Sequence, residues 1–167
     1  MSLAFLSAPG GVEGAIASPL RRALEDADPA QIRDISLEGI VEIRGDIDAI
    51  APAPGEELLR LSPRRGFLFT DGDPVAAAER VRAAGARAYD ATGAYAGLAI
   101  ASEQAMRRLT DLDLDTIPTA GPLVRVSALF RRDADGWYRV YVHQELGHYV
   151  AEAVLDVLAG LQEQTWH

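Results

Sequence analysis

Residues 124–142 read VRVSALFRRDADGWYRVYV, and this stretch carries the strongest β-strand pattern in the chain. From Val124 to Phe130 every second residue is apolar or small, and the alternation resumes from Tyr138 to Val142. A period of two is typical of a strand with one buried face. The stretch therefore predicts a β-hairpin of residues 124–131 and 138–142, joined by a turn at 133–136.

The elements predicted around this hairpin mix helices and strands. Residues 145–160 form an amphipathic helix pattern with the apolar stripe Leu146, Val150, Ala153, Val154, Val157, Leu158 and Leu161. Further helices are predicted at 18–27, 45–52, 74–84 and 102–109, three of them from start signals such as Asp73-Pro74. Strands are predicted at 32–36, 40–44, 58–61, 67–70, 87–91 and 95–101. We expect 58–61 to pair with 67–70 and 87–91 with 95–101, whereas 111–122 is predicted to be an irregular polar connection.

This order of elements predicts an α+β fold of mainly antiparallel sheet with packed helices. An acid followed by a hydroxyl residue two positions later, Asp34 and Ser36, recurs as Asp90 and Thr92, in each case before an apolar strand and a helix. Such pairs commonly stabilise turns, but their recurrence also suggests a duplication. We therefore predict a single compact domain, 18–167, made of two similar halves at about 18–85 and 86–160, after an irregular arm at 1–17.

The amino-acid composition of the chain excludes several kinds of catalytic and metal site. There are 167 residues with no cysteine, and all 16 basic residues are arginine. The absence of cysteine excludes disulfides and thiolate metal centres, and the absence of lysine excludes a Walker-A lysine and Schiff-base catalysis. Arginine also does not act as a base at neutral pH. Catalysis would therefore depend on carboxylates, hydroxyls and three histidines.

The charge balance argues against two classes of partner. With 25 acids the net charge is −9, and such a surface repels phosphate backbones unless its arginines form a separate patch. The arginines instead occur as scattered pairs along the sequence, so we expect no nucleic-acid partner. No apolar run reaches the roughly 18 to 20 residues of a membrane span. The sequence predicts a cytoplasmic protein with no membrane contact, and its arginine-rich usage fits a high-GC bacterial genome.

Residues 34–39, DISLEG, and 43–46, IRGD, resemble a signature of the aminomethyltransferase (glycine-cleavage T-protein) family of folate-binding proteins. The second half, with DATG at 90–93 and LAI at 98–100, is similar to the same superfamily, and the resemblance covers about 18–160. Among its short members, the chain looks most like the gamma subunit of heterotetrameric sarcosine oxidase. The resemblance implies the fold of that superfamily.

Departures from the family pattern bear on the implied chemistry. Folate-using members hold the pterin with a glutamate in a G-E-x-G-F-E segment, where this chain has residues 133–138 and only Asp135 as a stand-in. The catalytic acid of the family corresponds at best to Asp71. The K-G-C motif of the iron–sulfur assembly relatives is absent. The resemblance therefore implies a non-catalytic or vestigially folate-binding subunit that helps to organise larger flavin- and folate-bearing subunits.

Two other functions remain open on the sequence alone. One is a stand-alone tetrahydrofolate-binding protein or one-carbon (aminomethyl) transferase, and the other is a self-associating interaction module. For a ligand site, Asp71, Asp90, Thr92 and Tyr95 are candidates at predicted strand ends, where turn or cap roles are the plainer interpretation. Under the folate hypothesis, Arg125 and Arg139 on neighbouring strands would hold the glutamate tail and Asp135 the pterin.

No metal site is predicted. His143 and His148 are five residues apart, and on a helix that spacing turns the two imidazoles away from each other. The sequence also singles out no catalytic residue.

Overall fold

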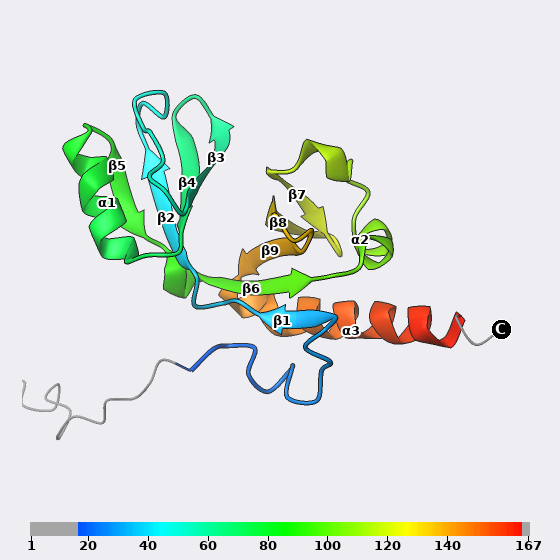
Figure 1. Ribbon diagram of the computed structural model, residues 1–167. Helices are drawn as coiled ribbons and strands as arrows, with labels where there is room; N and C mark the ends of the chain where they lie inside the picture. Colours follow the sequence, from blue (N-terminus) through cyan, green and yellow to red (C-terminus); the bar gives the residue numbers. More distant parts are fainter. Residues whose placement is uncertain (1–16, 165–167) are drawn as a thin grey trace, which may run out of the picture.

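Two antiparallel sheets pack against each other between outer helices in the computed structural model, which describes residues 17–164 (Figure 1). The strands are β1 Ile32–Asp34, β2 Gly39–Arg44, β3 Glu56–Ser62, β4 Arg65–Thr70, β5 Arg87–Asp90, β6 Tyr95–Ile100, β7 Thr119–Leu123, β8 Val126–Arg132 and β9 Tyr138–His143. The α-helices are α1 Pro74–Ala83, α2 Glu103–Leu109 and α3 Gly147–Gln164. Short 3-10 turns occupy Thr92–Ala94, Leu114–Thr116 and Gln144–Leu146. The predicted α+β class with antiparallel sheets is confirmed.

The two sheets exchange strands, because the chain crosses between them at 35–38 and again at 91–94. One sheet has the order β3-β4-β2-β5 and the other β1-β6-β9-β8-β7. β1 precedes β2 in sequence but pairs with β6, and β5 precedes β6 but pairs with β2. The connections β1–β2 and β5–β6 therefore both pass from one sheet to the other, and they do so side by side (Figure 1).

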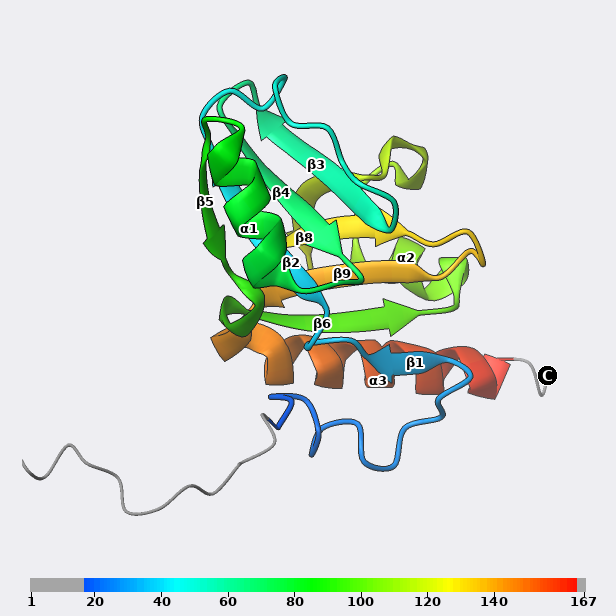
Figure 2. The same cartoon turned by 60° about the vertical axis from the view of Figure 1, so that its left-hand side comes forward.

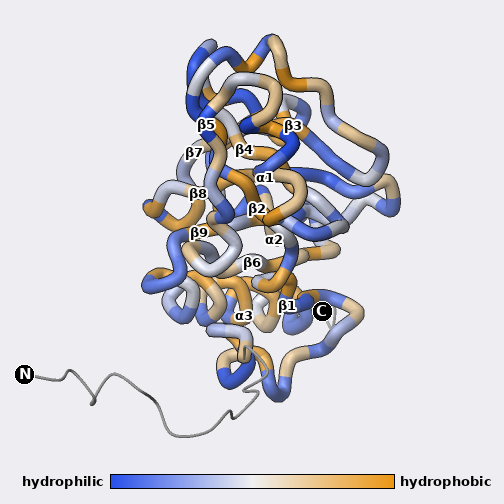
Figure 3. Tube along the Cα trace, turned by 90° about the vertical axis from the view of Figure 1, so that its left-hand side faces the viewer, coloured by the Kyte–Doolittle hydropathy of each residue, from blue (hydrophilic) through white to orange (hydrophobic). Residues whose placement is uncertain are grey.

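Three apolar clusters lie between the layers. One packs α1 on the outer face of the four-stranded sheet, with Val41, Leu68 and Val81 fully buried (Figure 2). A second lies between the sheets and contains Phe67, Phe69 and Tyr141. The largest packs α2 and α3 on the outer face of the five-stranded sheet. Figure 3 shows hydrophobic stretches in β2 and α3, which supply many of these buried side chains.

Local signals in the sequence account for the starts of α1 and α2. The Asp73 side chain accepts a hydrogen bond from Val75 N–H at 2.9 Å, and Pro74 follows it at the first helical position. Ser102 accepts from Ala105 N–H at 3.1 Å and caps α2 in the same manner. The predicted stripe of α3 is also observed, since Val150, Val154 and Leu158 are buried against the sheet.

The hairpin at 124–142 forms, but its first strand begins two residues later than predicted. Val124 and Arg125 have φ values of 48° and 69° and make the tight turn between β7 and β8, so β8 begins at Val126. All of β7 except Leu123 lies within the stretch 111–122 that is predicted to be irregular. A strand there was obscured by Gly121 and Pro122, which are tolerated because β7 is the edge of its sheet.

Two predicted helices are absent. Residues 18–27 form successive turns instead of a helix. Most of their backbone hydrogen bonds join an N–H to the C=O three residues earlier, as from Arg21 to Ser18. The N–H of Leu24 is the exception and bonds to the C=O of Leu20, four residues earlier. A helix of this length needs a buried face, and only Leu20 is fully buried here. Residues 45–52 contain a single turn, from Ile50 N–H to Ile47 C=O.

The predicted pairing of 87–91 with 95–101 is also wrong, because β5 and β6 belong to different sheets. The pairing of 58–61 with 67–70 is confirmed by β3 and β4.

No helix within residues 17–164 combines the length and hydrophobicity that crossing a bilayer requires. Apart from Ala17, the predicted N-terminal arm lies outside the described residues.

Candidate functional site

The crossing of the two connections is built from one hydrogen-bond pattern used twice. Asp34 accepts from Ser36 N–H, and Asp90 accepts from Thr92 N–H, each at 3.0 Å. The hydroxyl oxygen of Ser36 accepts the N–H of Gly97 on β6, and that of Thr92 accepts the N–H of Ile40 on β2, each at 3.1 Å. The turn-forming role considered for these residues is therefore confirmed, and each turn also binds the neighbouring sheet. The duplication itself stays a prediction.

Glu38, in the β1–β2 connection, receives two donors from β9. Arg139 donates to Glu38 Oε1, and the Tyr141 hydroxyl donates to Oε2 at 2.6 Å. Arg139 Nε also lies 2.5 Å from Asp133 Oδ1 in an ion pair that is not aligned as a hydrogen bond. The Arg139 guanidinium is thus compensated by two carboxylates.

A second ion pair joins the sheets through β3 and β8. Arg131 Nε donates to Glu57 Oε2 at 2.6 Å, while its Nη1 lies 3.4 Å from the Tyr141 hydroxyl. The Arg131 guanidinium also lies over the ring of Phe69, 4.6 Å from its centre. Only 13% of the Arg131 side chain is exposed, so this pair is much better shielded from solvent than a surface salt bridge. The five charged residues Glu38, Glu57, Arg131, Asp133 and Arg139, with Tyr141, are called the inter-sheet network below.

Burial and charge fix the protonation of this network. Burial raises the pKa of Tyr141 well above its usual range, and the neighbouring Glu38 carboxylate adds to the effect. For Arg139, burial lowers the pKa, but the charges of Asp133 and Glu38 and the hydrogen bond to Glu38 outweigh this effect and raise the pKa above its usual value. At neutral pH Tyr141 is therefore neutral and Arg139 charged, so neither group is suited to exchange a proton with a substrate.

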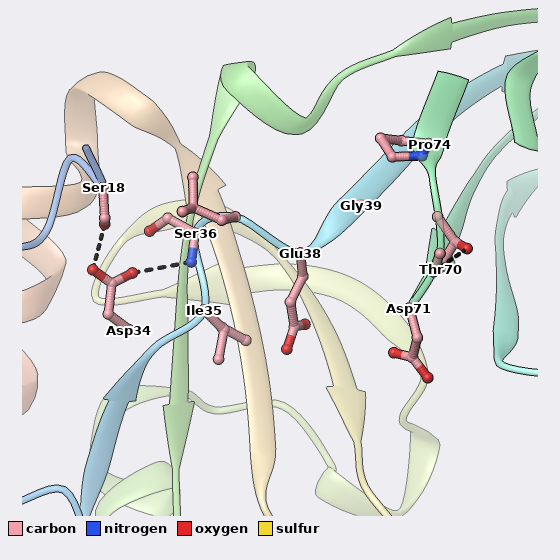
Figure 4. A pocket seen from close by; sticks show the side chains of 11 residues that line it. Ser18, Asp34, Ile35, Ser36, Glu38, Gly39, Thr70, Asp71 and Pro74 are labelled. Carbon is pink, nitrogen blue, oxygen red and sulfur yellow. Dashed lines mark hydrogen bonds between the residues drawn. The ribbon is translucent and has the colours of Figure 1, made fainter. Parts of the chain in front are cut away.

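An acidic cavity of about 590 Å³ lies beside the crossing and is shown in Figure 4. Asp34, Glu38 and Asp71 line it together with the hydroxyls of Ser18, Ser36 and Thr70. Asp34 already accepts from Ser18 and from the Ser36 backbone, as the dashed lines in Figure 4 mark, and Glu38 is held by β9. Two of the three acids in the cavity, Asp34 and Glu38, are therefore already hydrogen-bonded within the protein.

A second cavity, of about 440 Å³, opens between the sheets and is aromatic. The Tyr95 ring stacks on His143 with centres 5.2 Å apart, and Phe67 meets Tyr95 edge-on at 5.7 Å. Burial, followed by the charge of Glu42, raises the pKa of Tyr95. Tyr141 forms part of the wall, so this cavity borders the inter-sheet network.

The candidate residues from the sequence do not form one site. Asp71 lines the acidic cavity and Tyr95 the aromatic one, while Asp90 and Thr92 stabilise the crossing. Asp135 is exposed in the β8–β9 turn. These four strand-end candidates and Asp135 are thus distributed over separate regions of the molecule.

The donor set expected for tetrahydrofolate is not assembled. Arg125 lies in the β7–β8 turn rather than on a strand, which contradicts its expected place beside Arg139. Arg139 is bound to Glu38 and Asp133, and Asp135 lines none of the cavities described above. The described residues therefore do not fit folate in the expected manner.

The sequence interpretation missed most of the inter-sheet network. Of its six members only Arg139 is among the residues predicted for a site, and Glu38, Glu57, Arg131, Asp133 and Tyr141 are not. Tyr141 is 1% exposed. A signal was present in residues 138–142, where arginine and tyrosine occupy alternate positions of an otherwise apolar strand. A face that carries long polar side chains can be buried when another sheet supplies the counter-charges.

Histidines and acids form no metal centre in the described part of the chain. No group of three histidine, aspartate or glutamate side chains within residues 17–164 is placed to hold an ion. His143 ends β9 and His148 lies in the first turn of α3, and both are exposed.

The fold resembles that of a chain in the heterotetrameric sarcosine oxidase of Corynebacterium sp. U-96, solved in complex with pyrrole 2-carboxylate, with a TM-score of 0.73. The two sequences are 13% identical, and the match covers 86% of this chain and 95% of that chain. The chain has the fold of a sarcosine oxidase subunit. The structural match therefore extends over most of both chains. No protein-family model and no curated sequence matches the chain.

Proposed function

We propose that this protein is a non-catalytic subunit of a sarcosine-oxidase-like assembly, in the position of the gamma subunit, and that it organises larger flavin-bearing subunits. The observation that carries the proposal is the near-complete mutual coverage with a single chain of a heterotetrameric enzyme. A fold shared at 13% identity does not specify function by itself. The side chains of this protein must therefore also be compatible with a non-catalytic subunit.

The polar side chains support a structural role. Within residues 17–164 the carboxylates of Glu38, Glu57 and Asp133 are paired with arginines that join the two sheets. A general base or nucleophile needs a reactive atom free to reach a substrate. These carboxylates are instead engaged in ion pairs within the protein, where they stabilise the fold.

Several large apolar side chains are available for contact with other subunits. Leu37, Val75, Tyr89 and Tyr149 are between 49% and 57% exposed. Tyrosine in particular is enriched at protein interfaces. Contact with larger chains would cover part of this surface.

The test is to purify the full tagged chain from the organism that encodes it and to analyse the product by native mass spectrometry and visible absorbance. We expect a complex of fixed stoichiometry that contains larger chains and flavin and releases hydrogen peroxide when sarcosine is added. A protein that is always recovered alone, or only as a homo-oligomer, would contradict the proposal.

Calorimetry addresses the stand-alone folate-binding alternative. Because Asp135, Arg125 and Arg139 are separated or already paired, we expect no heat and no thermal shift with tetrahydrofolate up to millimolar concentration. Saturable binding to the isolated chain would instead favour the folate-binding function.

A further inference from the structure

Three neighbouring strands place an arginine in the same row at one end of the four-stranded sheet. Arg44 on β2 is the direct cross-strand partner of Arg65 on β4 and of Arg87 on β5. Directly opposite residues of antiparallel strands have Cβ atoms roughly 4.5–5.5 Å apart and point to the same face. Arg64, in the β3–β4 turn, adds a fourth guanidinium at this end of the sheet, which is uppermost in Figure 1.

Like charges in directly opposite positions destabilise a sheet. Glu42 partly offsets the row, because its carboxylate accepts from Arg44 Nε at 3.0 Å and from Arg65 Nε at 3.1 Å. The guanidinium groups of Arg64 and Arg87 have no hydrogen-bond or ion-pair partner among the residues that the structure describes. The nearby Asp46 carboxylate accepts the N–H of Asp48.

A cavity of about 360 Å³ lies where these side chains meet. Its lining consists of Arg44, Arg64 and Arg87 with Gly45 and Gly85, and it includes no apolar side chain. Both glycines have positive φ, at 138° and 93°, and a Cβ at Gly85 would meet nothing within 4 Å. The cavity is thus lined by three arginines and by two glycines of positive φ.

We propose that this arginine cavity is an oxyanion-binding site, which takes the phosphate or carboxylate group of a small molecule. Guanidinium forks match the paired oxygens of either group in a bidentate manner. The absence of apolar lining argues against a ring or an aliphatic chain as the part that is held. A long polyanion is disfavoured because the molecule as a whole carries a net charge of −9. Binding an anion would relieve the repulsion within the row.

The experiment is a titration of the full chain with inorganic phosphate, followed by nuclear magnetic resonance of backbone amides and arginine Nε–H groups. Chloride is exchanged for phosphate at constant ionic strength, so that general screening is unchanged. We expect saturable shifts confined to Arg44, Gly45, Arg64, Gly85 and Arg87. A parallel titration with citrate distinguishes the two sources, since tighter phosphate binding indicates a phosphate ester and tighter citrate binding a carboxylate.

Arg87→Gln is the test variant, and it should fold because the exposed Arg87 side chain makes no ion pair among the described residues. We expect it to weaken phosphate binding about tenfold, the loss typical of one charge-assisted hydrogen bond. Arg64→Gln should act similarly and serves as a second variant. The matched control is Arg22→Gln, which removes the same charge from an exposed arginine outside the cavity.

Equal affinities for Arg87→Gln, Arg64→Gln and Arg22→Gln would overturn the proposal, as would phosphate shifts spread over all arginines. A failure of both phosphate and citrate to bind would overturn it as well. These outcomes do not depend on any partner subunit, so they are independent of the proposed function.

Discussion

At the scale of single residues, Tyr141 joins the two sheets by packing and by charge together. Its ring lies between the sheets against Phe69, with centres 4.8 Å apart, while its hydroxyl contacts Glu38 and Arg131. A carboxylate on the crossing connection and a guanidinium on β8 therefore meet at one phenol. Removing that oxygen leaves both charged partners incompletely satisfied.

We expect Tyr141→Phe to lower the free energy of unfolding by about 1 to 2 kcal/mol, because a hydrogen bond to a charged group is lost in a buried site. Urea denaturation followed by circular dichroism measures the change. Tyr149→Phe is the control, since its hydroxyl donates to Val124 C=O but the residue is 49% exposed. An equal effect of the two substitutions would contradict the role assigned to Tyr141.

The raised pKa of Tyr141 predicts a loss of stability in alkali. The unfolded phenol ionises near pH 10, whereas the folded one keeps its proton to higher pH. Above pH 10 the unfolded state therefore loses protons that the folded state retains, and the free energy of unfolding falls as pH rises. Tyr141→Phe should make this decline shallower without abolishing it, because burial also raises the pKa of Tyr95. The measurement is the free energy of unfolding at pH 8 to 11, taken from denaturation curves. The prediction is wrong if this free energy falls equally steeply with pH in Tyr141→Phe and in the unchanged protein.

At the scale of elements, the β8–β9 turn depends on a glycine in the left-handed region. Gly136 has φ of 86° and a Cβ there would meet nothing within 4 Å, so only backbone strain opposes a side chain. We expect Gly136→Ala to cost about 1 kcal/mol in unfolding free energy. Gly93→Ala is the matched control, with equally open space and no positive φ. Thermal denaturation should show a lower midpoint for Gly136→Ala alone.

The same conformational region explains why one turn was predicted and another was not. The β8–β9 turn contains Gly136, whereas both central residues of the β7–β8 turn are non-glycine with positive φ. Val124 in particular continues the alternation of the strand, so local sequence extends the strand through it. Tertiary contacts hold the turn, since Val124 N–H donates to Leu109 C=O at 2.8 Å and Tyr149 donates to Val124 C=O. Such contacts have no signature in the sequence around Val124.

Most strands and all three α-helices of the described residues could be predicted because their patterns are local, but the assignment of strands to sheets could not. β1 and β5 each lie next in sequence to a strand of the opposite sheet. The sequence did not predict which residues form the inter-sheet network for the same reason. Glu38 and Tyr141 meet across 103 positions, and no local rule links an acid in a turn to a strand that far away.

At the scale of the whole molecule, the strand exchange predicts that the two sheets unfold together. β1 belongs by sequence to the first half but completes the second sheet, and β5 completes the first. We expect one cooperative transition, with coincident midpoints for circular dichroism and tryptophan fluorescence. Two separate transitions would contradict this expectation.

The predicted halves give a complementary test. A fragment of residues 18–85 lacks β5 and gives β1 no partner. We expect this fragment to be largely unfolded by circular dichroism, and a fragment that folds on its own would show that the sheets are independent.

The exchange also has a consequence for synthesis on the ribosome. β1 leaves the ribosome early but its partner β6, Tyr95–Ile100, follows only after the whole four-stranded sheet has been made. At the usual rates of elongation this delay is on the order of several seconds. During that interval β1 and the buried Leu20 before it stay exposed, so the nascent chain presents an unpaired strand next to an apolar residue. Slow translation between β2 and β6 would lengthen the interval, and a chaperone that binds extended apolar segments would have its clearest target there.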